Sequence, residues 1–139
     1  RRMELLGTVR GIEVYDDFAH HPNAIETTLD GARKRLGERK LWAIIEPRSN
    51  TMRMGSHKDG LAHSARLADE VIWYQPEGLD WDLQPVVAAA PNKAKIARTL
   101  DDIIHTVSQE AGEGDAVVIM SNGGFGGLHQ KLLSALKSA

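Results

Sequence analysis

The sequence predicts an α/β fold of the doubly wound type, with a mostly parallel sheet of about six strands, one antiparallel edge strand and helices on both faces. Short apolar runs alternate with helical patterns of about 10–15 residues, which is typical of strands joined by crossover helices. The run over residues 41–45 is continuously apolar, as in a strand buried on both faces. A length of 139 residues suits one domain, so we expect residues 1–139 to form a single unit.

The first half of the chain begins with two β-type runs, residues 3–9 and 12–15, joined by Arg10-Gly11. A two-residue link that ends in glycine favours a tight hairpin, which supplies the antiparallel strand. Pro22 then opens a helical pattern, since the first turn of a helix has no use for its missing N–H. Gly37 is the expected end of that helix.

The second half continues the alternation of strands and helices. Thr99 and Asp102 form a capping pair, and Ser56 with Asp59 resembles another. The expected elements are a strand at 41–45, a helix carrying Leu61, Ala65 and Ala68, a strand at 71–74, a short strand at 86–90, a helix carrying Leu100, Ile103, Ile104 and Val107, a strand at 116–120, and a helix after Gly126-Gly127.

The bulk composition excludes several classes of protein. A formal net charge of −2 gives no overall attraction to nucleic acid or to an acidic membrane, and no apolar run approaches the roughly 18 residues of a membrane span. The absence of cysteine excludes disulfides, thiolate catalysis and cysteine-based zinc sites. We therefore expect a cytoplasmic protein that binds neither nucleic acid nor membrane. The chain opens directly in a strand, which predicts a piece of a longer polypeptide.

Three polar segments follow predicted strands, at residues 16–23, 46–58 and 121–127. Ligands of such sheets bind beyond the carboxyl ends of the strands, so one composite site is expected there. The first segment holds two carboxylates and two imidazoles before a helix start, which suits an anion or a hydrated cation. Alternatively, Asp16 or Asp17 caps the helix and the histidines are simply exposed.

The other two segments add groups that bind anions or approach a ligand closely. Arg48 and Arg53 can pair with carboxylate or phosphate, or they are ordinary surface arginines. The glycine-rich segment lacks the third glycine of a dinucleotide fingerprint, because His129 stands there. A zinc hydrolase is disfavoured because the histidines lack helical ligand spacing. Its candidate ligands would be Asp17, His20, His21, His57 and His63.

The first segment reads Asp16-Asp17-Phe18-Ala19-His20-His21-Pro22. It closely resembles the Asp-Asp-Tyr-Ala-His-His-Pro motif of the third domain of the Mur ligases, and the resemblance spans essentially the whole chain. Residues 46–55 and 121–127 narrow it to members that join UDP-N-acetylmuramate to the recycled tripeptide L-Ala-γ-D-Glu-meso-diaminopimelate. The resemblance implies a Rossmann-like domain of a three-domain enzyme of peptidoglycan recycling.

The resemblance also implies ATP and Mg²⁺ as cofactors, an acyl phosphate intermediate, and attack by the incoming amine. No G-x-x-x-x-G-K-[ST] phosphate loop occurs in the sequence, so ATP and Mg²⁺ should bind mainly to the missing central domain. The N-terminal and central domains are thus expected partners, and this domain alone should be inactive. The alternative is a stand-alone nucleotide- or peptide-binding module without ligase activity.

The family motif assigns roles to individual residues. Asp17 and His20 are the expected catalytic residues, and with His21 they are the expected nucleotide contacts. Phe18 replaces the usual tyrosine and so lacks its hydroxyl. No residue is assigned as a metal ligand. The expected substrate-binding residues are Phe18, His20, Arg48, Asn50, Arg53, Ser121 and Asn122.

Overall fold

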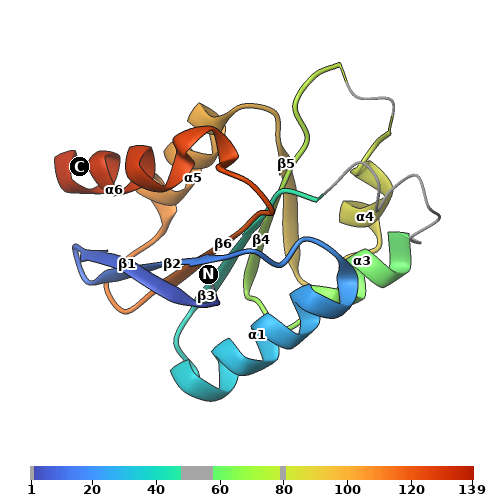
Figure 1. Ribbon diagram of the computed structural model, residues 1–139, viewed down its shortest axis with the longest axis horizontal. Coiled ribbons are helices and arrows are strands. Elements are labelled where there is room, and N and C mark those ends of the chain that lie inside the picture. The colour runs from blue at the N-terminus through green and yellow to red at the C-terminus, as the bar shows by residue number, and fades with distance from the viewer. Residues whose placement is uncertain (1, 48–57, 79–80) are drawn as a thin grey trace.

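The computed structural model describes residues 2–47, 58–78 and 81–139, and it has the predicted α/β architecture (Figure 1). Six strands form one sheet in the order β1-β2-β6-β3-β4-β5, in which β1 is antiparallel to β2 and the other pairings are parallel. The elements are β1 (Glu4–Val9), β2 (Ile12–Asp17), α1 (Pro22–Leu36), β3 (Leu41–Ile45), α3 (Lys58–Ser64), β4 (Glu70–Tyr74), α4 (Gln84–Ala88), β5 (Lys93–Ala97), α5 (Leu100–Glu110), β6 (Ala116–Met120), the 3₁₀ turn η1 (Phe125–Gly127) and α6 (Leu128–Ser138).

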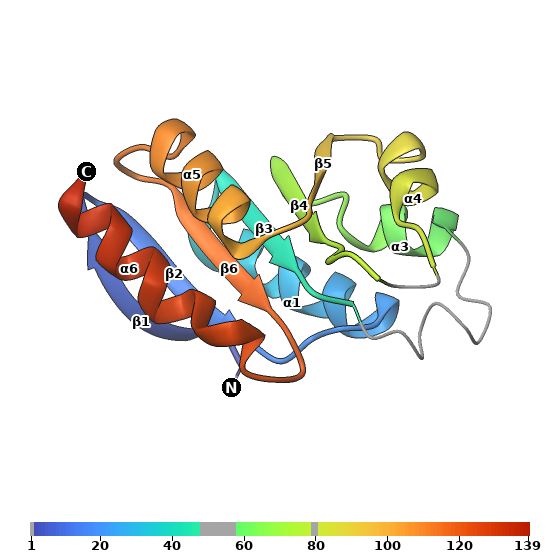
Figure 2. The same ribbon diagram turned by 90° about the horizontal axis from the view of Figure 1, so that it is seen from above.

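Helices cover both faces of the sheet, as predicted. The apolar sides of α1, α3 and α4 pack on one face, and those of α5 and α6 pack on the other. Figure 2 shows α6 lying along the hairpin of β1 and β2, while α4 and α3 lie toward the β4–β5 side. The inner strands β3 and β6 are buried along their whole length because both of their faces are covered.

The local signals for turns and helix ends are confirmed. Arg10 and Gly11 both have positive φ, 56° and 74°, which matches the tight hairpin turn that brings β1 beside β2. Gly37 ends α1 with φ of 67°, and the hydroxyl of Thr99 accepts the backbone N–H of Asp102 at the start of α5. These residues set where the strands and helices begin and end.

The predicted strand at residues 86–90 is wrong. Residues 84–88 form helix α4, with a proline in its first turn, and the strand lies further on, at β5. Two smaller corrections concern lengths: β2 runs on through both aspartates, and α3 ends at Ser64, so Ala65 and Ala68 lie beyond it although both are buried. Ser56, the expected cap of that helix, lies outside the described residues.

The chain order places a topological switch point at the carboxyl end of β6. Strand β6 is last in sequence but lies between β2 and β3. The chain leaves β2 and β3 toward the face that α1 and α3 cover, whereas it leaves β6 toward the opposite face and α6. Neighbouring strands whose connections diverge leave room between them, which is where ligands bind in such sheets.

Candidate functional site

The three segments predicted to share one site begin side by side. The backbone N–H of Ser121 donates to the carbonyl of Asp17 at 3.1 Å, and the N–H of Glu46 donates to the carbonyl of Met120 at 2.9 Å. The Ser121 hydroxyl also donates to Oε1 of Glu46 at 2.5 Å. The ends of β2, β6 and β3 are thus tied together. Three predicted substrate contacts, Arg48, Asn50 and Arg53, lie outside the described residues.

Asp17 is a buried carboxylate that organises the backbone around it. Its Oδ1 accepts the N–H of Ala19 at 2.9 Å and the hydroxyl of Thr28 at 3.2 Å, while Oδ2 accepts the N–H of Met3 at 2.9 Å. It does not cap helix α1, because the N-cap position belongs to His21, whose side chain makes no capping bond. Asp17 instead holds together the entry to β1, the turn after β2, and the first turns of α1.

Asp16 points to the other face of the sheet, because successive side chains of a strand alternate. Its Oδ1 lies 2.9 Å from Nε2 of His129 on α6, and both side chains are largely buried. A carboxylate accepts hydrogen bonds, so Nε2 of His129 carries the proton in this contact. Asp16 therefore couples the end of β2 to α6, while Asp17 couples it to α1.

One ring nitrogen of His20 is fixed by a hydrogen bond, and the other makes none to the residues that the structure describes. Its Nδ1 lies 2.8 Å from the carbonyl oxygen of Phe18. A carbonyl can only accept, so Nδ1 is the protonated nitrogen, and Nε2 of the neutral ring carries a lone pair. The ring of His21 meets His20 edge-on, with centroids 5.1 Å apart and an angle of 82° between the planes. His20 is partly exposed and His21 exposed.

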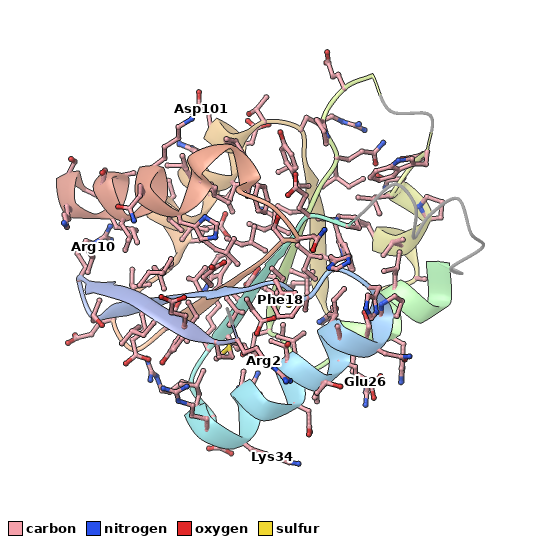
Figure 3. All side chains as sticks on the ribbon, in the orientation of Figure 1. Arg2, Arg10, Phe18, Glu26, Lys34 and Asp101 are labelled. Carbon is pink, nitrogen blue, oxygen red and sulfur yellow. The ribbon has the colours of Figure 1, made fainter. Side chains whose placement is uncertain are left out.

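A pocket of about 400 Å³ lies beside this turn, between the entry to β1 and the start of α1. Figure 3 shows Arg2 and Phe18 close together in this region. Arg2 supplies a cation, Phe18 an aromatic ring that is 46% exposed, and Asn23 and Thr27 supply polar groups. Asp17 and His21 also line it. The pocket therefore gathers three of the predicted contacts, whereas Ser121 is not among its lining residues.

The glycine-rich segment after β6 takes an unusual backbone path. Ser121 is fully buried, and its Oγ accepts the N–H of Gly123 at 3.1 Å, while Asn122 is exposed. Phe125, Gly126 and Gly127 all have positive φ, from 51° to 78°. A side chain on Gly126 would meet Leu100, because its Cβ would lie 2.8 Å from Cδ1 of that residue. Glycine is favoured there mainly by its positive φ, and an added Cβ would also displace the end of the Leu100 side chain.

Sequence reasoning did not assign a role to Glu46 or Tyr74, which lie at the same edge. Burial raises the pKa of the Tyr74 hydroxyl, and the negative charge of Glu46 raises it further. The Tyr74 ring packs against Phe125 with centroids 5.1 Å apart. Glu46 is the first residue of the second polar segment and directly follows a fully buried strand.

Within residues 2–47, 58–78 and 81–139, no group of three or more histidine or acidic side chains is arranged to hold a metal ion. In the same part of the chain, no helix is both long enough and apolar enough to span a membrane.

The family model and the most similar sequences point to one family. Residues 1–123 match the family model of the Mur ligase, glutamate ligase domain. The chain belongs to the Mur ligase family. It is 47% identical over 137 residues to the UDP-N-acetylmuramate–L-alanyl-γ-D-glutamyl-meso-2,6-diaminoheptandioate ligase of Escherichia coli K12, with 98% of this chain and 30% of that relative covered.

Solved structures of similar proteins share the fold of this Mur ligase domain. A murein peptide ligase from Psychrobacter arcticus is 56% identical with a TM-score of 0.93, covering 100% of this chain and 30% of that one. A domain described as part of such a ligase from Haemophilus ducreyi is 43% identical with a TM-score of 0.85, covering 97% of this chain and 99% of that one. The chain thus spans about 30% of the length of its full-length relatives.

Proposed function

We propose that this Mur ligase domain positions substrate and nucleotide in an ATP-dependent ligase of peptidoglycan recycling. That enzyme would join UDP-N-acetylmuramate to the tripeptide L-Ala-γ-D-Glu-meso-diaminopimelate through an acyl phosphate. The main support is identity of 47% across 98% of the chain to a ligase whose name carries both substrates. His20 adds support because its Nδ1 is bonded to a backbone carbonyl, so Nε2 of the neutral ring can accept a hydrogen from the incoming amine.

His20 is our candidate for the residue that meets the incoming amine. An amine attacks a carbonyl only through its lone pair, so the ammonium form must first lose a proton. The unprotonated Nε2 of His20 accepts that hydrogen, and the Phe18 carbonyl keeps the ring in the tautomer that leaves Nε2 free for it. Asp17 acts in this proposal through the backbone, since its carboxylate holds the turn that carries His20.

The pocket beside the turn is the candidate nucleotide contact of this domain. Arg2 offers a cation to a phosphate or a hydroxyl, Phe18 offers an aromatic face to a base, and His21 adds a donor at the mouth. ATP would supply the phosphoryl group that activates the carboxylate. The described residues do not fit a Mg²⁺ site, so we assign that ion to the central domain and derive no step from it here.

The test is ATP-dependent ligation by the whole enzyme, with free tripeptide or L-alanine as the acceptor. The proposal expects the tripeptide to be used with a kcat/KM at least about 100-fold higher, and the isolated domain to be inactive. Equal use of the two acceptors would remove the assignment to tripeptide ligation. If ligation is independent of ATP, the assignment of the reaction class is wrong as well.

A further inference from the structure

Glu46 is held in a defined position just beyond the carboxyl end of β3, and among the described residues only one of its carboxylate oxygens accepts a hydrogen bond. Its backbone N–H is bonded to the Met120 carbonyl, and its Oε1 accepts the Ser121 hydroxyl at 2.5 Å. Ser121 is itself fully buried. The position of the carboxylate is therefore fixed by two adjacent strands, β3 and β6, and its second oxygen has no hydrogen-bond partner within the described part of the chain.

Within the described part of the chain, no lysine, arginine or histidine forms an ion pair with Glu46. Glu70 provides the contrast: its carboxylate lies 3.2 Å from Nζ of Lys40 and 3.6 Å from Nζ of Lys93. Glu46 is partly buried, and its charge is felt by Tyr74, whose pKa it helps to raise. A carboxylate taken partly out of water favours a cationic partner.

We propose that Glu46 receives a ligand ammonium group, and that this is the free amino group at the far end of the diaminopimelate residue in the peptide acceptor. This inference rests on the function proposed above. It makes Glu46 a specificity-determining residue for the third residue of the peptide, and not a participant in the bond-forming step.

The two free amino groups of the peptide acceptor have different roles in the reaction. The L-alanine amine forms the new bond and must lose a proton, whereas the diaminopimelate amine stays charged throughout. A carboxylate contact stabilises the ammonium form and would oppose deprotonation of the reacting amine. The lone pair on His20 Nε2 can accept a hydrogen from the reacting amine. The negative charge of Glu46 can pair with the amine that remains an ammonium.

The experiment compares two peptides in one preparation of the whole ligase. One is the natural tripeptide, and the other carries 2-aminopimelate, which keeps both carboxylates but lacks the far amino group. The ratio of their kcat/KM values is independent of the fraction of folded enzyme. We expect wild type to prefer the natural peptide by about 10-fold or more. Glu46→Gln should bring the ratio close to one, mainly by raising KM for the natural peptide.

Two further variants serve as controls, one that keeps the negative charge at position 46 and one that removes a negative charge elsewhere. Glu46→Asp keeps the charge and should keep a preference for the natural peptide. Glu38→Gln removes an exposed carboxylate at the opposite end of β3 and should leave the ratio at the wild-type value.

Three outcomes would overturn the inference. A ratio that Glu46→Gln leaves unchanged would show that Glu46 does not sense the far amine. A raised Mg²⁺ requirement in that variant, with both peptides affected equally, would assign Glu46 to the metal instead. If wild type ligates L-alanine but not the tripeptide, the proposed function fails, and the assignment of this amine fails with it.

Discussion

The two ends of the parallel sheet both carry charged residues, but they use them in different ways. At the amino end, Arg39 donates to the carbonyl of Gly114 at 2.6 Å and to Oε1 of Glu13 at 2.9 Å. Asp115 accepts the indole N–H of Trp42 at 3.0 Å. Arg39, Glu13 and Asp115 are thus paired with each other or with other groups of the same sheet edge.

At the carboxyl end, polar side chains are held in place by one hydrogen bond each and keep a further donor or acceptor atom. Among the described residues, His20 has one bonded ring nitrogen and Glu46 has one bonded carboxylate oxygen, and Phe18 exposes an aromatic ring beside a pocket. Polar groups whose hydrogen-bonding atoms all have partners contribute to the free energy of unfolding. Polar groups that are held in place but keep an unbonded donor or acceptor are suited to bind a ligand. We therefore expect substitutions at the amino end to change stability and substitutions at the carboxyl end to change activity.

The largest effect is expected for His20→Ala, which tests the functional end. Loss of the acceptor for the amine should lower kcat/KM of the whole ligase by about 100-fold or more. The stability should change little, because the ring is partly exposed and its bond is to a local carbonyl. His105→Ala, at an exposed position on α5, is the matched control and should leave kcat/KM unchanged. Equal activity of the two variants would contradict the role of His20.

Arg39→Met tests the structural end in the same way. The substitution keeps most of the aliphatic stem but removes the bonds to Gly114 and Glu13, so it should lower the free energy of unfolding by about 2 kcal/mol. Urea unfolding of the domain measures this directly. The whole ligase, assayed well below its Tm, should keep its kcat/KM. A loss of activity without a loss of stability would show that the two ends are not separate in their roles.

Gly126→Ala lies between these cases, since the residue shapes the carboxyl end through packing. Its φ of 59° is unfavourable for alanine, and the new Cβ would lie 2.8 Å from Leu100. We expect a loss of about 1–2 kcal/mol in the free energy of unfolding. Gly124→Ala is the control, because Gly124 has φ of −80° and open space around it. If both variants unfold at the same denaturant concentration, neither the positive φ nor the contact with Leu100 matters for stability.

The elements that could be predicted from the sequence are those with strong local signals. The apolar strands β3 and β6, the Arg10-Gly11 hairpin and the Thr99 cap all depend on residues close together in the chain. Strand β5 was missed because it is an edge strand, in which exposed Lys93 and Lys95 alternate with partly buried residues. The apolar run before it forms helix α4, where a proline in the first turn and alanines favour a helix.

The adjacency of the three polar segments could be predicted from the sequence, but the contacts of their individual residues could not. A dense polar motif after a strand is visible in the sequence, and the family resemblance gives it meaning. The opposite directions of Asp16 and Asp17 depend on β2 continuing through both, and the contact of Glu46 with Ser121 depends on β6 entering between β2 and β3. Both are consequences of long-range topology, which local patterns do not encode.

The smallest effect concerns the pH dependence of the amino end. The Tyr15 hydroxyl donates to Glu13 at 2.8 Å, and this bond, followed by the bond from Arg39, lowers the pKa of Glu13 against the opposing effect of its burial. A lowered pKa in the folded state means that the carboxylate stabilises the fold above the ordinary pKa of glutamate. That contribution is lost as the pH falls through the folded-state value.

Glu13→Gln should therefore be less stable than wild type near neutral pH, by about 0.5 kcal/mol for a pair on the sheet rim. The difference should shrink as the pH falls below the ordinary range of a glutamate, because the wild-type carboxyl then becomes protonated. Urea unfolding of both proteins across this range measures it, with Glu38→Gln as the exposed control. If the difference in the free energy of unfolding stays constant at acidic pH, the shape of the Glu13 side chain and not its charge provides the stability. Ion pairing would then contribute less at the amino end of the sheet than its contacts indicate.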